Sequence, residues 1–301
     1  MNKQEQNLLD LFQYVLDNGK YVPNRTGTGT YRIIDAGLRF DLSDGSVPFM
    51  TTKKVNVLNP IGEMLWMLAG KTDLKTLRHY QNKPEGAHTI WSDDFEKFWK
   101  RLEDKFDGQN FTYRDQEEGG RIYGINLRHY EGIDQLRTLL RNIKAVKDDP
   151  THPAARRLKC EWWSPIYHLD DEQLMAALPA CHTGFQCIVD GDKLTLKYFM
   201  RSNDMFLGKP YNLAAYGWLL HVLAHLTGLK VGELIYDGTD VHIYENHIEQ
   251  VKTLLSRKPK PFPKMVMPKF DTLEELLKLT AKDFIIIGYE PEGFIAAPQA
   301  S

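Results

Sequence analysis

The sequence is poor in cysteine, and it has neither a long apolar run nor an excess of charge of one sign. Its three cysteines, Cys160, Cys181 and Cys187, form neither a disulfide framework nor a zinc-site spacing. No apolar run approaches the roughly 20 residues that a membrane span requires. A net charge of −2 gives no broad attraction to nucleic acid, so an anionic substrate would need positive charge placed locally. These absences predict a reduced, cytoplasmic protein without a metal centre, a membrane segment or a nucleic-acid partner.

The sequence also lacks repeats, low-complexity segments and linkers, which predicts one domain over residues 1–301. Apolar spacing predicts helices at residues 8–16, 60–68, 134–146 and 211–226. Alternation predicts strands at residues 31–42 and 284–287. His221 and His225 lie four apart on the last helix, but without a third ligand at a metal-site spacing they are expected to pack on a face of that helix.

A hairpin signal lies in the second half of the chain. Apolar and β-branched runs at 185–189 and 194–200 flank Asp190-Gly191-Asp192. If the turn centres on Gly191 and Asp192, Cys181 lies opposite Ser202 and beside Arg201. A neighbouring guanidinium favours the nucleophilic thiolate. A buried, inert cysteine is the alternative, and one bulge would shift the pairing.

Several motifs around this hairpin agree in order and spacing. Pro179-Ala180-Cys181-His182, residues 201–208 (RSNDMFLG) and Pro210-Tyr211-Asn212 resemble the catalytic core of the thymidylate synthases and of the related pyrimidine nucleotide hydroxymethylases. The resemblance covers nearly the whole chain, with insertions near residues 96–120 and 163–177. It implies an α+β fold, a mixed sheet flanked by helices in a single catalytic domain. It also implies a homodimer in which the two sheets pack back to back.

The resemblance assigns a set of catalytic residues. Cys181 would add to C6 of dUMP, and 5,10-methylenetetrahydrofolate would deliver one carbon to C5. Glu63, a carboxylate within an apolar helix, and His182 would handle protons. Tyr123 would lie near C5, and Asp204 would hold the pterin of the folate.

The resemblance also assigns the residues that bind the nucleotide. The phosphate would be bound by arginines shared across the dimer interface, Arg25 and Arg201 with the partner's Arg156 and the partner's Arg157. Ser202 belongs to the same motif. Asn212 would read the base, and a carboxamide there favours uracil over cytosine because it can donate to O4 and accept from N3–H. His242 and Tyr244 would bind the ribose hydroxyl.

On the folate side, the resemblance assigns residues from three segments. The wall of the site would include Ile90 and Trp91, with Leu207 and Gly208 nearby. Lys53 would lie near the glutamyl tail.

Three departures from the synthase pattern bear on the product. Gln299 and Ser301 are polar where the tail of a synthase is apolar, Asp94 and Phe95 stand where a second tryptophan is expected, and Met200 precedes Arg201. Because water and hydride compete for the same intermediate, a more open site favours hydroxymethylation. The expected product is therefore 5-hydroxymethyl-dUMP, in a bacterium or a virus-infected cell. The alternatives are dTMP with dihydrofolate, or a non-catalytic nucleotide- or RNA-binding relative.

Overall fold

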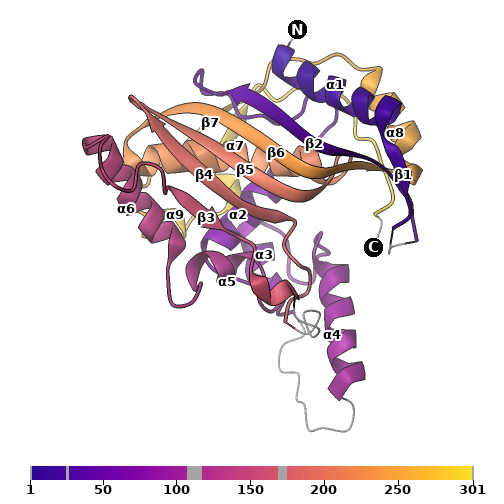
Figure 1. Cartoon of the computed structure of the whole chain (residues 1–301), viewed down its shortest axis with the longest axis horizontal. Helices are drawn as coiled ribbons and strands as arrows, with labels where there is room; N and C mark the ends of the chain where they lie inside the picture. The colour runs from indigo at the N-terminus through magenta and orange to yellow at the C-terminus, as the bar shows by residue number, and fades with distance from the viewer. Residues whose placement is uncertain (1, 25–26, 107–116, 169–174, 300–301) are drawn as a thin grey trace.

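The chain is built on a six-stranded mixed sheet, in a computed structural model that describes residues 2–24, 27–106, 117–168 and 175–299 (Figure 1). The strand order is β1-β2-β6-β5-β4-β3. Only β5 and β6 pair in parallel, and the other neighbours are antiparallel. The strands are β1 (Lys20–Val22), β2 (Thr30–Asp41), β3 (Lys159–Glu161), β4 (His182–Asp190), β5 (Lys193–Asp204) and β6 (Lys230–Tyr244). A separate antiparallel pair joins β7 (Lys264–Val266) to β8 (Ile285–Ile287).

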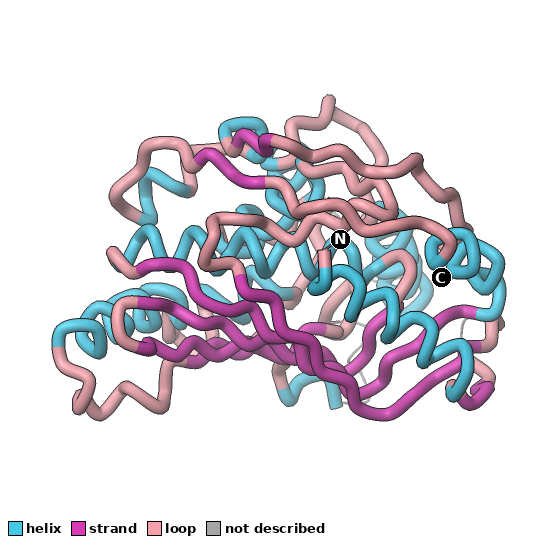
Figure 2. The backbone as a smooth tube through the Cα atoms, turned by 90° about the horizontal axis from the view of Figure 1, so that it is seen from above, coloured by secondary structure: helices cyan, strands magenta, loops and turns pink. Residues whose placement is uncertain are grey.

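Most of the helices lie on one side of this sheet, as Figure 2 shows. They are α1 (Lys3–Asn18), α2 (Leu58–Leu68), α3 (Leu74–Tyr80), α4 (Ser92–Phe106), α5 (Tyr123–Arg128), α6 (Gln135–Asp148), α7 (Gly208–Thr227), α8 (Ile248–Leu255) and α9 (Leu273–Leu276). Short 3₁₀ turns occur at Pro165–His168, Glu245–His247 and Ala281–Asp283. The predicted α+β class, with a mixed sheet and flanking helices in one domain, is confirmed.

Helix α7 is the buried centre of the helical layer and packs on β5 and β6. It ends where the sequence predicts, because Gly228 adopts a left-handed conformation with φ 67° that an L side chain rarely takes. His221 and His225 bind the backbone carbonyls of Ser46 and Phe270 through Nε2, at 2.9 and 2.7 Å. The packing role predicted for these two histidines is therefore confirmed.

The β4–β5 hairpin has the predicted turn, but its register changes before Cys181. Asp190 pairs with Lys193 around Gly191, and the predicted pairing continues back to Gly184 opposite Phe199. A bulge between His182 and Gly184 then shifts the strand by one residue. As a result the Arg201 N–H donates to the Cys181 carbonyl at 3.0 Å. The prediction that Cys181 faces Ser202 is wrong, because the bulge adds one residue to β4.

The two predicted insertions meet at their ends. The segment 96–120 contains most of α4, and its residues 107–116 lie outside the described part of the chain; so do residues 169–174 of the segment 163–177. Gly120 forms a bridge with Ala176, and Arg121 N–H donates to the Met175 carbonyl at 2.7 Å. This contact fixes the entry to α5, which begins with Tyr123.

Two kinds of feature are absent from the described residues. Among their helices, none is long and apolar enough to cross a membrane. Within the same residues, no group of three or more His, Cys, Asp or Glu side chains is arranged to hold a metal ion.

Candidate active site

Cys181 and Arg201 lie side by side at the bulged end of the hairpin. The Arg201 Nη2 is 3.9 Å from the Cys181 Sγ. The guanidinium is held by its Nε–H, which donates to the Ala180 carbonyl at 2.8 Å, and by its position 5.3 Å from the Trp163 ring. Cys181 is only partly buried, whereas Cys160 and Cys187 are fully buried and burial raises the pKa of both thiols. Cys181 is therefore the one thiol of the three with both access and an adjacent positive charge.

Tyr123 lies directly behind the thiol. Its hydroxyl accepts a hydrogen bond from the Cys181 backbone N–H at 2.8 Å. The ring is buried, and burial raises the pKa of Tyr123 well above its ordinary value. The hydroxyl stays protonated near neutral pH, so it can position the nucleophile loop and still donate a hydrogen bond toward the substrate space.

His182 is held in its neutral form by the residues behind it. Burial, followed by the nearby charge of Lys209, lowers the pKa of His182 to about 4, while a hydrogen bond with Asn212 acts in the opposite direction. The Tyr216 hydroxyl lies 3.1 Å from His182 Nδ1 and accepts from the Trp162 indole N–H at 2.9 Å. Because the indole can only donate, the hydroxyl proton is free to point at Nδ1. This places the ring proton of His182 on Nε2.

Glu63 and Trp91 form a second part of the site. Trp91 Nε1–H donates to Glu63 Oε1 at 2.7 Å, and the Trp91 ring meets Tyr123 edge-on at 5.9 Å. Burial raises the pKa of Glu63, against the effect of the Trp91 hydrogen bond. Trp91 is almost buried, while Ile90 is 52% exposed and can meet a ligand. A carboxyl group with a raised pKa suits proton transfer near neutral pH.

The turn after β5 carries Asp204, Leu207 and Gly208. Asp204 Oδ1 accepts from the backbone N–H groups of Phe206 and Leu207 at 2.8 and 3.2 Å, which fixes the turn into α7. One carboxylate oxygen is thus used locally, while Oδ2 forms no hydrogen bond or ion pair with the described residues.

Lys53 does not have the position that its predicted role needs. Its ammonium donates to the Phe206 carbonyl at 2.6 Å and lies over the Phe206 ring. The side chain is only 2% exposed, and burial lowers the pKa of Lys53 to about 8. In this conformation Lys53 has no exposed charge to offer a glutamyl carboxylate. It supports the turn beside Asp204 instead.

The residues predicted to bind the base and the ribose lie on α7 and β6. Asn212 Nδ2 lies 3.4 Å from Met200 Sδ. On β6, the His242 and Tyr244 rings meet edge-on at 5.2 Å, so the predicted placement on one strand face is confirmed. Ser202 pairs with Asp240 across the parallel β5–β6 ladder. This pairing brings the end of the Cys181 hairpin next to the ribose residues.

Three predicted phosphate-binding arginines lie elsewhere in the chain or outside its described part. Arg25 lies outside the described residues, and Arg156 and Arg157 are exposed in the turn before β3. Their contribution to the phosphate site of a partner chain stays a prediction.

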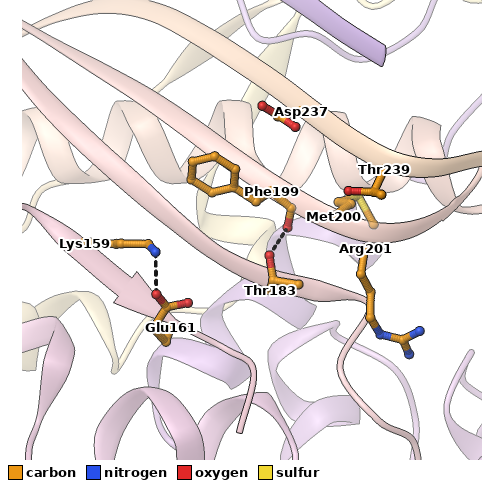
Figure 3. A pocket seen from close by; sticks show the side chains of 8 residues that line it. All are labelled: Lys159, Glu161, Thr183, Phe199, Met200, Arg201, Asp237 and Thr239. Atoms are coloured by element: carbon orange, nitrogen blue, oxygen red, sulfur yellow. Dashed lines mark hydrogen bonds and ion pairs between the residues drawn. The ribbon is translucent and has the colours of Figure 1, made fainter. Parts of the chain in front are cut away.

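A cavity of about 260 Å³ adjoins the site at Arg201 and Met200 (Figure 3). Its other lining residues are Lys159, Glu161, Thr183, Phe199, Asp237 and Thr239. Lys159 and Glu161 form an ion pair at 2.5 Å, and the Thr183 hydroxyl donates to the Phe199 carbonyl at 3.3 Å. The cavity therefore has a lining of mixed charge, with Lys159 and Arg201 as its cations and Glu161 and Asp237 as its carboxylates.

Two residues that orient site histidines, Asp240 and Tyr216, were not predicted from the sequence. Asp240 binds His242 Nδ1 at 2.7 Å through Oδ1 and pairs with Arg32 at 3.1 Å through Oδ2. The spacing of two between Asp240 and His242 on one strand was an available signal. Tyr216, which bonds His182, lies inside an apolar helix and gave no local signal.

Comparisons with known proteins agree with this geometry. The family model described as thymidylate synthase matches residues 6–301. A protein of Escherichia phage T5 named "Probable thymidylate synthase" is 39% identical over 98% of this chain and 100% of its own length. Proteins named "Thymidylate synthase" from two strains of Listeria monocytogenes, HCC23 and F2365, are each 36% identical over 96% of this chain and 98% of their own length. On the extent of these matches, the chain belongs to the thymidylate synthase family.

Proposed function

We propose that this enzyme converts dUMP to dTMP, with methylenetetrahydrofolate as the source of the carbon and of the hydride. The reaction class follows from the family: the chain is a one-carbon transferase that uses methylenetetrahydrofolate as co-substrate for transfer to C5 of dUMP. The identity of the product depends on whether hydride or water completes the reaction.

Cys181 is proposed as the nucleophile. Its thiolate forms a bond to C6 of dUMP, and the electrons of the C5–C6 double bond move to C5 and O4. The single observation that carries this proposal is the 3.9 Å contact between the Cys181 Sγ and the Arg201 guanidinium, which favours the thiolate. Glu63 and the neutral His182 then move protons at the base, and Tyr123 lies behind the thiol, near the position proposed for C5.

The nucleotide is proposed to bind along the ends of β5 and β6 and the start of α7. Asn212 pairs with the uracil edge, His242 and Tyr244 hold the ribose, and Arg201 with Ser202 binds the phosphate. Asp204, Leu207, Gly208, Ile90 and Trp91 are proposed to contact the folate.

A homodimer is proposed to complete the phosphate site. Most of the described helices lie on one side of the sheet (Figure 2), and strands β2 and β4 carry the exposed side chains of Ile34 and Ile188, which supports packing against a second copy. Arg25, the partner's Arg156 and the partner's Arg157 would then join Arg201. Mixing inactive Arg157→Glu chains with inactive Cys181→Ala chains should restore about a quarter of normal activity, because random pairing gives half heterodimers with one intact site each. Mixtures that stay inactive although heterodimers form would contradict sharing.

Methylation is preferred because the C-terminal tail is docked through its backbone. The Arg257 guanidinium donates to the Gly293 carbonyl at 2.6 Å, and His247 Nε2 lies 2.7 Å from the Pro298 carbonyl. Ile295 is buried, and the His247 ring contacts Phe206 in the turn after Asp204 at 5.5 Å. This anchoring does not depend on the polar side chain of Gln299, which is exposed. Docked beside the turn, the tail favours the exclusion of water.

Hydroxymethylation to 5-hydroxymethyl-dUMP is the second candidate. Asp94 stands on α4 where the resemblance expects a second tryptophan, and a carboxylate there makes that wall more polar. Ser301 lies outside the described residues, so the argument from the terminal side chain stays a prediction. If water completes the reaction, Ser301→Val should move the product ratio toward dTMP.

The test is to incubate the protein with dUMP and methylenetetrahydrofolate and identify the nucleotide by mass spectrometry, while following dihydrofolate absorbance. dTMP with an equal amount of dihydrofolate is expected. Hydroxymethyl-dUMP without dihydrofolate would replace the first candidate by the second. Cys181→Ala should abolish either product, whereas Cys187→Ala, a buried thiol on the same strand, should keep turnover.

A further inference from the structure

His247 is a buried histidine in the short 3₁₀ turn that follows β6. This turn, Glu245–His247, is held at its start, because the Glu245 backbone N–H donates to the Gly29 carbonyl at 2.9 Å. The Glu245 carboxylate in turn accepts the Gly29 N–H at 2.7 Å. The His247 side chain is fully buried, and the proposed chemical steps do not use it. It is therefore an imidazole in a fixed position without an assigned role.

The two ring nitrogens of His247 are used unequally. Nε2 lies 2.7 Å from the Pro298 carbonyl, which can only accept a hydrogen bond, so Nε2 carries a proton. Nδ1 is buried and has no hydrogen-bond partner among the described residues. A buried polar atom without a partner is costly, and an apolar ring in the same place would avoid that cost. The gain from an imidazole at this position therefore lies in its bond to Pro298.

The bond from His247 is the polar attachment of the end of the C-terminal tail. In the part of the tail that the structure describes beyond residue 293, residues 294–299, the backbone forms one hydrogen bond with other described residues, at Pro298. Ile295 is the one buried side chain among these six residues, and Pro298 and Gln299 are exposed. The gain from a single hydrogen bond shifts an equilibrium by about twofold to 12-fold. The balance between a docked and a released tail end therefore depends on His247.

The His247 ring also contacts two residues of the proposed binding site. Its centre lies 5.5 Å from that of the Phe206 ring and 5.6 Å from that of the Tyr244 ring. Phe206 belongs to the turn after β5, and its N–H donates to the Asp204 carboxylate at 2.8 Å. Tyr244 is the residue proposed to hold the ribose. His247 thus connects the tail with both the folate side and the nucleotide side of the site.

We propose that His247 is a positioning residue that holds the end of the tail against the site and thereby sets the ratio of the two possible products. This role rests on the proposed function, in which a methylene carbon on C5 of the nucleotide accepts either hydride or water. Hydride from the folate gives dTMP and dihydrofolate, whereas water, which loses a proton as it adds, gives hydroxymethyl-dUMP and tetrahydrofolate. In both cases Cys181 leaves C6 as the C5–C6 double bond re-forms. Release of the tail admits water, so the product ratio should follow the balance between released and docked tail.

The test removes the N–H donor in His247→Phe and His247→Leu and restores a donor in His247→Gln. Without substrate, carboxypeptidase Y should trim the full-length protein past Pro298 about twofold to 12-fold faster in the Phe and Leu variants, because trimming needs a released tail. Intact mass measures this rate. With dUMP and methylenetetrahydrofolate, the ratio of hydroxymethyl-dUMP to dTMP should rise by the same factor, as quantified by mass spectrometry against isotope-labelled standards. His247→Gln should return both values toward those of the parent protein.

His221→Phe is the matched control. His221 is also buried, and its Nε2 lies 2.9 Å from a backbone carbonyl outside the tail, that of Ser46. Loss of this bond should leave the trimming rate and the product ratio unchanged.

An unchanged trimming rate in the folded donor-free variants would overturn the proposal. A product ratio that stays at the parent value although trimming is faster would overturn the link between His247 and the product. Trimming needs no turnover, so faster trimming in a protein that forms neither product would contradict the proposed function and leave the hold of His247 on the tail intact. If one donor-free variant does not fold, the other carries the test, since Phe and Leu fill the space of the imidazole differently.

Discussion

The Glu63–Trp91 pair allows the catalytic role of a carboxyl group to be separated from its structural role. Glu63→Gln keeps an oxygen in the place where Glu63 Oε1 accepts from Trp91 Nε1 at 2.7 Å, but it cannot transfer a proton. Because general acid–base groups contribute about 100-fold to 10,000-fold, we expect turnover to fall by that factor. Glu63→Ala should lose the same activity and also leave the buried indole N–H without a partner.

The two variants should therefore differ in stability. An unsatisfied buried donor costs about 1–3 kcal/mol. At about 2–4 °C per kcal/mol for a chain of this size, Glu63→Ala should melt about 2–12 °C below Glu63→Gln. The assays are dihydrofolate release and thermal unfolding monitored by circular dichroism.

The effect of pH on the same variants has a definite sign. Since burial raises the pKa of Glu63, its contribution to stability is fully present below the ordinary value of 4.5 and is lost as the pH rises through the folded-state pKa. Glu63→Gln does not ionise, so its stability relative to the parent protein should improve as the pH rises from 4.5 to the raised folded-state pKa of Glu63. Turnover within tenfold of the parent protein, or equal melting of the two variants, would refute the reasoning.

Three further predictions concern Arg201, Glu5 and Lys53. Arg201→Lys keeps the positive charge but loses the planar guanidinium group, which is held beside Cys181 by its bond to the Ala180 carbonyl. Alkylation of Cys181 by iodoacetamide should therefore slow by about twofold to tenfold. An unchanged alkylation rate would contradict the pairing of Arg201 with Cys181. Glu5 is buried and accepts four hydrogen bonds from the backbone and hydroxyl groups of Thr51 and Thr52. Glu5→Ala leaves two backbone N–H groups unpaired, at about 1–3 kcal/mol each, so it should lower the free energy of unfolding by about 2–6 kcal/mol in denaturant titrations. A loss below about 1 kcal/mol would argue against this. Because burial lowers the pKa of Lys53 to about 8, the unfolded chain binds more protons than the folded chain between pH 8 and 10.5. The free energy of unfolding should therefore increase with pH over that range, and in Lys53→Met this increase should be lost. An equal dependence on pH in both proteins would exclude Lys53 as its source.

Much of the site was predictable because its chemistry lies in short motifs. Cys181 and Arg201 are joined by one hairpin, which the turn residues Asp190-Gly191-Asp192 indicate in the sequence. Their contact was therefore predicted from the sequence alone. The bulge that puts Arg201 directly opposite Cys181 was not predictable in position, because nothing local specifies which residue of β4 is left unpaired.

The burial of charged side chains was also not predictable from the sequence. Lys53 stands in a basic pair that suggests an exposed surface, yet its ammonium lies inside and bonds the Phe206 carbonyl. Lys209 gave no signal of its own in the sequence, because its partners Tyr198 and Tyr236 come from two different strands. Such environments depend on which distant segments pack together.

The sequence by itself determined the family and the α+β class, and it predicted the nucleophile and most of the groups around it, because these depend on residue type and on short spacing. The tertiary structure alone decided the register at Cys181, the pairing of Ser202 with Asp240 across parallel strands, and the buried surroundings of His182. The physical reason is that hydrogen-bond pairing and loss of water around a charge are set by neighbours in space, and those neighbours are separated by tens of residues along the chain.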